Sequence, residues 1–122
     1  MRRMALVFAV ALAACTPAAT AETQVQLREF SIDAASRLTG GEQSLHVINQ
    51  GEFGHTLVVS TEDGTVVTST DVVPPGGETT LDLDLEPGRY VFTCRIVVQT
   101  PGGDIVDHYQ RGMAAAVEVV AP

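Results

Sequence analysis

The sequence predicts an all-β domain, a Greek-key β-sandwich or barrel of about seven to eight strands. Short segments rich in valine and threonine alternate between apolar and polar residues, which is the pattern of half-buried strands. Glycine and proline turns separate these segments, and no segment shows a long helical period. The chain has 122 residues, which is enough for one domain and too few for two.

The strands can be placed from the alternation and the turns. An Asp63-Gly64 pair predicts a hairpin between two of the strands. Leu81, Leu83 and Leu85 alternate with aspartates, as expected of a strand with one face in the core. Residues 33–38 allow one short helical turn at most. The predicted strands are 23–30, 44–49, 55–61, 65–70, 81–85, 89–94 and 114–120.

The N-terminus has the features of an export signal. Arg2 and Arg3 precede an apolar run over residues 4–14, which is shorter than the ~20 residues needed to span a bilayer. The run ends in Leu-Ala-Ala-Cys and resembles the lipobox of bacterial lipoproteins, which implies cleavage before Cys15 and a lipid on its thiol. We therefore expect a signal peptide (1–14), a lipidated Cys15 with a tether (15–22) and a domain (23–122). The alternative is an ordinary secretory signal with an incidental cysteine.

Charge limits the class of partner. The chain carries 15 acidic residues against 7 basic ones, for a formal net charge of −8. A nucleic-acid binder needs a basic face to neutralise phosphates, so we expect no nucleic-acid partner.

Four residues stand out as candidate metal ligands: His55, Cys94, His108 and Met113. If Cys15 carries a lipid, Cys94 is the only thiol of an exported domain and has no disulfide partner. A thiolate, two imidazoles and a thioether form a donor set that suits copper. Each also has a plainer interpretation, because Cys94 and Met113 could be core residues and the histidines could be surface residues. We interpret His46, in the middle of a strand, as a structural or surface residue.

Several segments together resemble the cupredoxins, the plastocyanin-like blue copper proteins, over nearly the whole mature domain. Leu27–Ile32 is similar to the first strands of that family. Val47–Gly51 and His55–Val59 are similar to its first-histidine region. Pro87–Cys94 is similar to the strand that leads into the copper cysteine, and His108–Met113 to the second histidine and the methionine.

The resemblance implies one copper ion that alternates between Cu(I) and Cu(II). His55, Cys94 and His108 would be equatorial ligands and Met113 a long axial one. It further implies a one-electron carrier rather than an enzyme, with a redox protein such as a cytochrome or a membrane oxidase as partner. The lipid on Cys15 would hold this carrier at the bacterial membrane, in the periplasm or at the cell surface. By resemblance, His108 would be the exposed exit for the electron. Thr56 stands where asparagine is more usual in the family.

Thirteen residues, 95–107, separate Cys94 from His108, more than is usual in the family. Residues 101–104 form a turn, so we expect an extra hairpin in which Thr100 pairs with Ile105. In a regular ladder of that register, His108 would lie about three rungs, or ~10 Å, from the level of Cys94. The ladder must therefore open before it reaches the site.

Three other functions remain compatible with the sequence. The same ligands could serve an extracytoplasmic copper buffer or chaperone. A metal-free binding module with an immunoglobulin-like sandwich would use none of them. A hydrolase with Cys94 as nucleophile ranks last, because no oxyanion-hole motif is recognisable.

Overall fold

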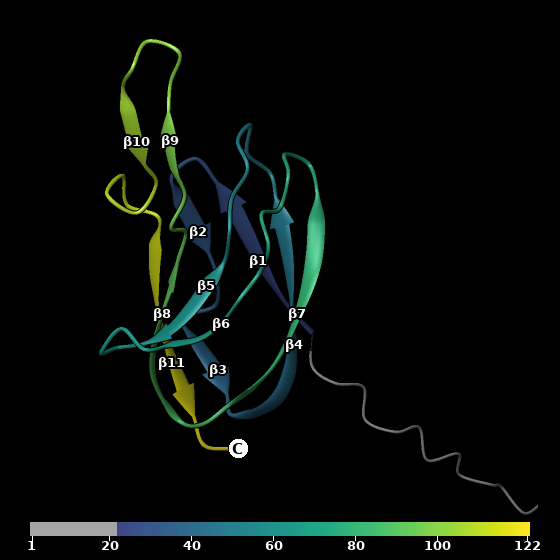
Figure 1. Ribbon diagram of the computed structural model, residues 1–122. Coiled ribbons are helices and arrows are strands. Elements are labelled where there is room, and N and C mark those ends of the chain that lie inside the picture. The colour runs from purple at the N-terminus through teal and green to yellow at the C-terminus, as the bar shows by residue number, and fades with distance from the viewer. Residues whose placement is uncertain (1–21) are drawn as a thin grey trace, which may run out of the picture.

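The computed structural model describes residues 22–122, which form eleven β-strands (Figure 1). The predicted signal peptide, Cys15 and the tether through residue 21 lie outside the described residues. Within residues 22–122, no helix is long and apolar enough to cross a membrane. The strands are β1 (Glu22–Arg28), β2 (Ser31–Asp33), β3 (Arg37–Thr39), β4 (Gly41–Asn49), β5 (Val58–Thr61), β6 (Val66–Ser69), β7 (Glu78–Leu85), β8 (Gly88–Thr93), β9 (Val97–Gln99), β10 (Ile105–Asp107) and β11 (Ala114–Val120).

The strands form two mixed sheets and a separate hairpin. One sheet has the order β2-β1-β4-β7, and the other has the order β3-β11-β8-β5-β6. The pairs β1–β4 and β3–β11 are parallel, and the remaining pairs are antiparallel. Strands β9 and β10 pair only with each other and project from one end of the sandwich (Figure 1). The predicted all-β sandwich class is confirmed.

The seven predicted strands correspond to β1, β4 to β8 and β11. The other four strands, β2, β3, β9 and β10, have three residues each. The helical turn allowed at residues 33–38 is wrong, because β2 ends at Asp33 and β3 begins at Arg37. The predicted strand over 55–61 begins only at Val58, and His55 makes a single bridge to Val73. This shorter strand leaves His55 in a loop at the end of the sandwich.

The predicted hairpin at Asp63-Gly64 is confirmed. Strands β5 and β6 are antiparallel, and the Thr61 amide donates to the Thr65 carbonyl over 2.9 Å. Gly64 has a φ of +92°, a conformation that side-chain-bearing residues rarely adopt.

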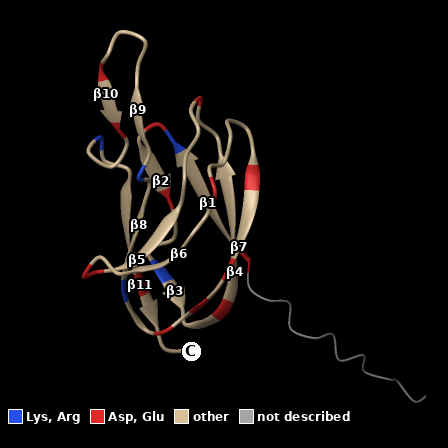
Figure 2. Cartoon of the chain, viewed as in Figure 1, with Lys and Arg blue, Asp and Glu red and all other residues tan. Residues whose placement is uncertain are grey.

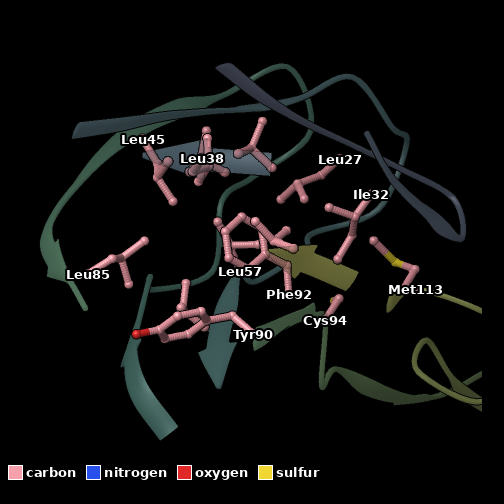
Figure 3. Packing of buried hydrophobic residues seen from close by; sticks show 14 of the residues in the cluster. Leu27, Ile32, Leu38, Leu45, Leu57, Leu85, Tyr90, Phe92, Cys94 and Met113 are labelled. Carbon is pink, nitrogen blue, oxygen red and sulfur yellow. The ribbon is translucent and has the colours of Figure 1, made fainter. Parts of the chain in front are cut away.

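The core lies between the two sheets (Figure 3). Strands β1 and β4 contribute alternate apolar residues such as Leu27 and Leu45, which are fully buried. Strand β8 contributes Phe92, also fully buried, and Cys94 follows two positions later on the same inward face. The alternation that fills the core therefore also directs the Cys94 thiol inward, at the edge of the apolar cluster.

Acidic residues occur at both ends of the sandwich and along β7 (Figure 2). Asp82 and Asp84 are exposed on β7. His46 on β4 lies between the carboxylates of Glu22 and Glu78, with a nitrogen 3.3 Å from each. This supports its interpretation as a structural or surface residue.

Candidate metal centre

Three of the four predicted ligands converge at one buried point. The side chains of His55 and Cys94 are fully buried, and His108 is 1% exposed. The Cys94 Sγ lies 3.8 Å from Nδ1 of His55 and 3.6 Å from Nδ1 of His108. The two Nδ1 atoms are 3.1 Å apart. Within the described residues, this is the group of histidine, cysteine and acidic side chains whose ligand atoms are close enough to hold one metal ion.

The triangle has the dimensions that a metal ion requires. A circle through its three corners has a radius of about 2.0 Å, close to the ~2.0–2.3 Å of imidazole and thiolate bonds to a first-row metal. One thiolate and two imidazoles in a trigonal arrangement are the in-plane donor set of blue copper sites. The residues present therefore fit a copper ion.

A fully buried asparagine shapes the loop that carries His55. The Asn49 side-chain nitrogen donates to the carbonyls of Phe53 and Val73 over 2.8 Å each, and its oxygen accepts from the Gly51 amide over 2.8 Å. The backbone of His55 then exchanges two hydrogen bonds with Val73, of 3.1 and 2.7 Å. These bonds fix the backbone from which the His55 ring enters the site.

Thr56 contacts the cysteine sulfur directly. Its backbone amide donates to Cys94 Sγ over 3.4 Å, and its hydroxyl oxygen lies 3.8 Å from the same sulfur. The hydroxyl also accepts from the Arg95 amide over 3.5 Å. Thr56 thus links the His55 loop to the Cys94 loop. It stands at the position where asparagine is more usual in the cupredoxins that the sequence resembles.

The segment between Cys94 and His108 is a hairpin, as predicted, but its register differs by one residue. Ile105 pairs with Gln99, rather than with Thr100. The Thr100 carbonyl accepts from Gly103 over 2.9 Å, and the Thr100 amide donates to Asp104 over 2.8 Å. Gly103 has a φ of +89°. A tight turn followed by a left-handed glycine adds a bulge, and the bulge shifts the register.

The ladder opens before the site, as expected. The last bond joins the His108 amide to the Ile96 carbonyl over 3.0 Å, and the chain then coils back through residues 108–112. The Met113 amide donates to the His108 carbonyl over 3.1 Å, and the Cys94 amide donates to the Met113 carbonyl over 3.2 Å. This coil brings the His108 ring inward to the level of Cys94.

A stacking contact outside the site joins the two ends of the inserted hairpin. The Arg95 guanidinium stacks over the Tyr109 ring, 3.8 Å from its centroid, in a cation–π contact. These two residues directly follow Cys94 and His108. Their role was not predicted, because stacking partners so far apart in the sequence leave no local pattern.

His108 is covered rather than exposed, so the predicted exposure of this histidine is wrong. The Phe30 ring meets its edge at 5.3 Å between centroids, and the Phe53 ring lies at 6.5 Å. Burial lowers the pKa of His108, and the neighbouring His55 lowers it further. Both effects favour the neutral imidazole, which is the form that binds a metal. The rings of Phe30 and Phe53 account for this covering.

Beside His108 is an apolar hollow of about 210 Å³. It lies between the inserted hairpin and the phenylalanines over the His108 ring. The lining residues are Phe30, Phe53, Val98, Thr100, Val106, His108 and Arg111.

Met113 is fully buried and belongs to the same apolar cluster as Cys94. Figure 3 shows its thioether at the end of the core where the Cys94 thiol lies. Their backbones are hydrogen-bonded to each other, so Met113 is placed beside the triangle. Its role as a ligand remains a prediction.

Sequence reasoning did not assign a role to Glu29, which contacts His55. Glu29 Oε1 lies 3.1 Å from Nε2 of His55. Burial raises the pKa of the Glu29 carboxyl, but hydrogen bonds from Phe53, Glu52 and His55 outweigh it and leave the pKa below its usual value. The one signal in the sequence is that Glu29 lies within Leu27–Ile32, the segment that resembles the first strands of the cupredoxins.

Solved structures share this fold, although no protein-family model and no curated protein matches the chain. Reduced auracyanin from Roseiflexus castenholzii is 19% identical with a TM-score of 0.62, over 84% of this chain and 99% of that one. Auracyanin B is 17% identical with a TM-score of 0.63, over 86% and 93%. Rusticyanin from Thiobacillus ferrooxidans is 19% identical with a TM-score of 0.59, over 81% and 77%.

A larger protein also contains the fold. A multi-copper oxidase from Pediococcus acidilactici is 13% identical with a TM-score of 0.62, over 99% of this chain but only 31% of that one. At these identities the similarity concerns the fold, and it confirms the cupredoxin-like β-sandwich predicted from the sequence.

The geometry makes a prediction about the inserted hairpin. Its turn, residues 101–104, is hydrogen-bonded to Thr100 and contributes no atom to the triangle. Replacing these four residues with Asn-Gly should therefore leave metal affinity unchanged within about a factor of two, since changes away from a site act within about 0.5 kcal/mol. Competitive metal titration measures the affinity. A loss of binding would show that the tip of the hairpin supports the site.

Proposed function

We propose that the chain is a type 1 (blue) copper protein that carries single electrons between extracytoplasmic redox partners. The observation that supports this most strongly is the buried triangle of His55 Nδ1, Cys94 Sγ and His108 Nδ1, whose size and donor chemistry fit copper. The similarity to auracyanin and rusticyanin adds support from the fold.

Bound copper supplies a one-electron Cu(I)/Cu(II) couple. The thiolate of Cys94 suits Cu(I), and the imidazoles suit Cu(II), so this ligand set serves both oxidation states. The surrounding hydrogen bonds from Asn49 and Thr56 hold the ligands in one arrangement. A site that does not rearrange between oxidation states allows fast electron transfer.

We propose that the redox partner docks at the hollow beside His108. The His108 ring borders this hollow, and Phe53 at its rim is 53% exposed. An apolar rim suits a protein partner such as a cytochrome or a membrane oxidase. An electron would leave through the His108 ring, across the hollow, or through the covalent path of Cys94.

Burial favours an electron carrier over a copper buffer or chaperone. Metal transfer requires an incoming ligand to reach the ion, whereas all three candidate ligands are at most 1% exposed. Electron transfer requires no such access. The buried cluster also argues against a metal-free module, because two imidazoles and a thiol in contact inside a core are costly unless they have a partner to bind.

The proposed function makes a direct prediction about copper binding. Cu(II) should bind one to one and produce an intense visible band from charge transfer between the thiolate and copper, with reversible oxidation and reduction. His108→Ala should abolish the band because it removes an in-plane nitrogen. His46→Ala, the matched control, should keep both band and stoichiometry, because His46 contacts Glu22 and Glu78 instead. Titration with Cu(II), followed by visible absorption, measures the band and the stoichiometry. If His108→Ala stays blue and His46→Ala loses the band, the second histidine ligand is His46 and not His108.

Met113 is proposed as a weak axial ligand that tunes the site more than it holds the metal. Met113→Leu should keep copper and the blue band, and it should raise the reduction potential because a donor to copper is lost. Spectroelectrochemistry measures the potential. Complete loss of copper would mean that Met113 is a principal ligand.

We also propose that the protein is anchored to the bacterial membrane by a lipid on Cys15. The support is the Arg-Arg pair, the apolar run and the Leu-Ala-Ala-Cys box in the sequence. Mass spectrometry of the N-terminal peptide from membrane-extracted protein should find an acylated Cys15. An unmodified N-terminus further along the chain would refute the anchor.

A further inference from the structure

We propose that Glu29 is a positioning residue of the metal centre, whose carboxylate orients His55 and lowers the reduction potential of the bound copper. This inference rests on the proposed function. It goes beyond that function by naming a residue outside the ligand set that determines the properties of the site.

The carboxylate of Glu29 is held in place at one oxygen by three donors. Glu29 follows β1 at its end nearest the site. Its Oε1 accepts hydrogen bonds from the backbone amides of Glu52 and Phe53, over 2.7 and 2.8 Å, and lies 3.1 Å from Nε2 of His55. The two amides belong to the loop that carries His55, so the carboxylate and the ring are fixed to the same segment.

The chain leaves space for this carboxylate. A Cβ atom added to Gly51 would collide with Oε1 of Glu29. Any side chain at position 51 would therefore displace the carboxylate. The Glu29 side chain is 25% exposed, and that of His55 is fully buried, so the interaction is largely shielded from water.

This contact determines which ring nitrogen of His55 carries the proton. A carboxylate only accepts hydrogen bonds, so Nε2 must donate to Glu29. Nδ1 then keeps its lone pair, and Nδ1 is the atom that faces Cys94 and His108. A carboxylate on the distal nitrogen of a ligating histidine orients the ring and raises its basicity.

The second imidazole has no such partner among the described residues. His108 is packed by the rings of Phe30 and Phe53. The two imidazoles therefore differ in their surroundings, one bound to a carboxylate and the other facing apolar groups. A negative charge behind His55 stabilises Cu(II) more than Cu(I), which lowers the potential.

Glu29→Gln separates the charge from the hydrogen bonds. A glutamine in the same position keeps an oxygen that can accept from all three donors, but it has no charge. Glu29→Ala removes both, and Gly51→Ala displaces the carboxylate without changing the charge of the chain. Glu52→Gln is the matched control, since it removes a charge from the same loop at an exposed side chain with no hydrogen bond to the site.

The full-length protein loaded with copper is the sample. We expect Glu29→Gln to keep the blue band. The ratio of its affinity for Cu(II) to its affinity for Cu(I) should fall about tenfold, which is a rise in reduction potential of about 59 mV for one electron. Gly51→Ala should raise the potential as well. Glu29→Ala should in addition weaken Cu(II) binding by about 10–100-fold. Glu52→Gln should change the potential by less than a third of the Glu29→Gln effect.

Nuclear magnetic resonance of the diamagnetic Cu(I) form gives an independent readout. The Nε2 proton of His55 should be visible and protected from solvent exchange in the unmodified protein, and it should be lost in Glu29→Ala. Equal potentials in Glu29→Gln and Glu52→Gln, or a His55 proton unaffected in Glu29→Ala, would overturn this inference alone. A protein that binds copper without a blue band would instead overturn the proposed function.

Discussion

The architecture depends on bringing three metal-binding atoms from distant parts of the chain to one buried point. These atoms, from His55, Cys94 and His108, lie within 4 Å of one another in a place that excludes water. Burying polar groups costs free energy, because they lose their hydration. The sandwich must therefore hold the donors rigidly, and most of the unusual contacts near this end of the fold serve that purpose.

The inserted hairpin shows how a long excursion can be accommodated in such a site. Backbone hydrogen bonds among Cys94, His108 and Met113 close its base, and the stacking of Arg95 on Tyr109 closes it again on the outside. Because the ends of the excursion are joined at the level of the site, its length affects the ligands little. The hairpin instead forms one wall of the apolar hollow beside His108, on the side where we propose that a redox partner binds.

Alternation and turn residues were sufficient to predict the seven longer strands, because these patterns are local. The four candidate ligands could be proposed because their residue types and order resemble a known site, and the structure brings His55, Cys94 and His108 together. The bulge at Gly103, which shifts the hairpin by one residue, is also local, because it arises from hydrogen bonds within residues 100–104 and a left-handed glycine. Local patterns could not predict the covering of His108 by Phe30 and Phe53. Nor could they reveal Glu29, whose link to His55 depends on a loop folding back over 26 residues of sequence. These last two features arise from tertiary contacts.

X-ray absorption spectroscopy of the copper-loaded protein tests the central claim most directly. If the triangle is the metal site, copper should have one sulfur and two nitrogen neighbours in its plane, at nearly the same distances in the Cu(I) and Cu(II) forms. The absence of a short copper–sulfur distance, or a set of ligands that changes with oxidation state, would contradict the account.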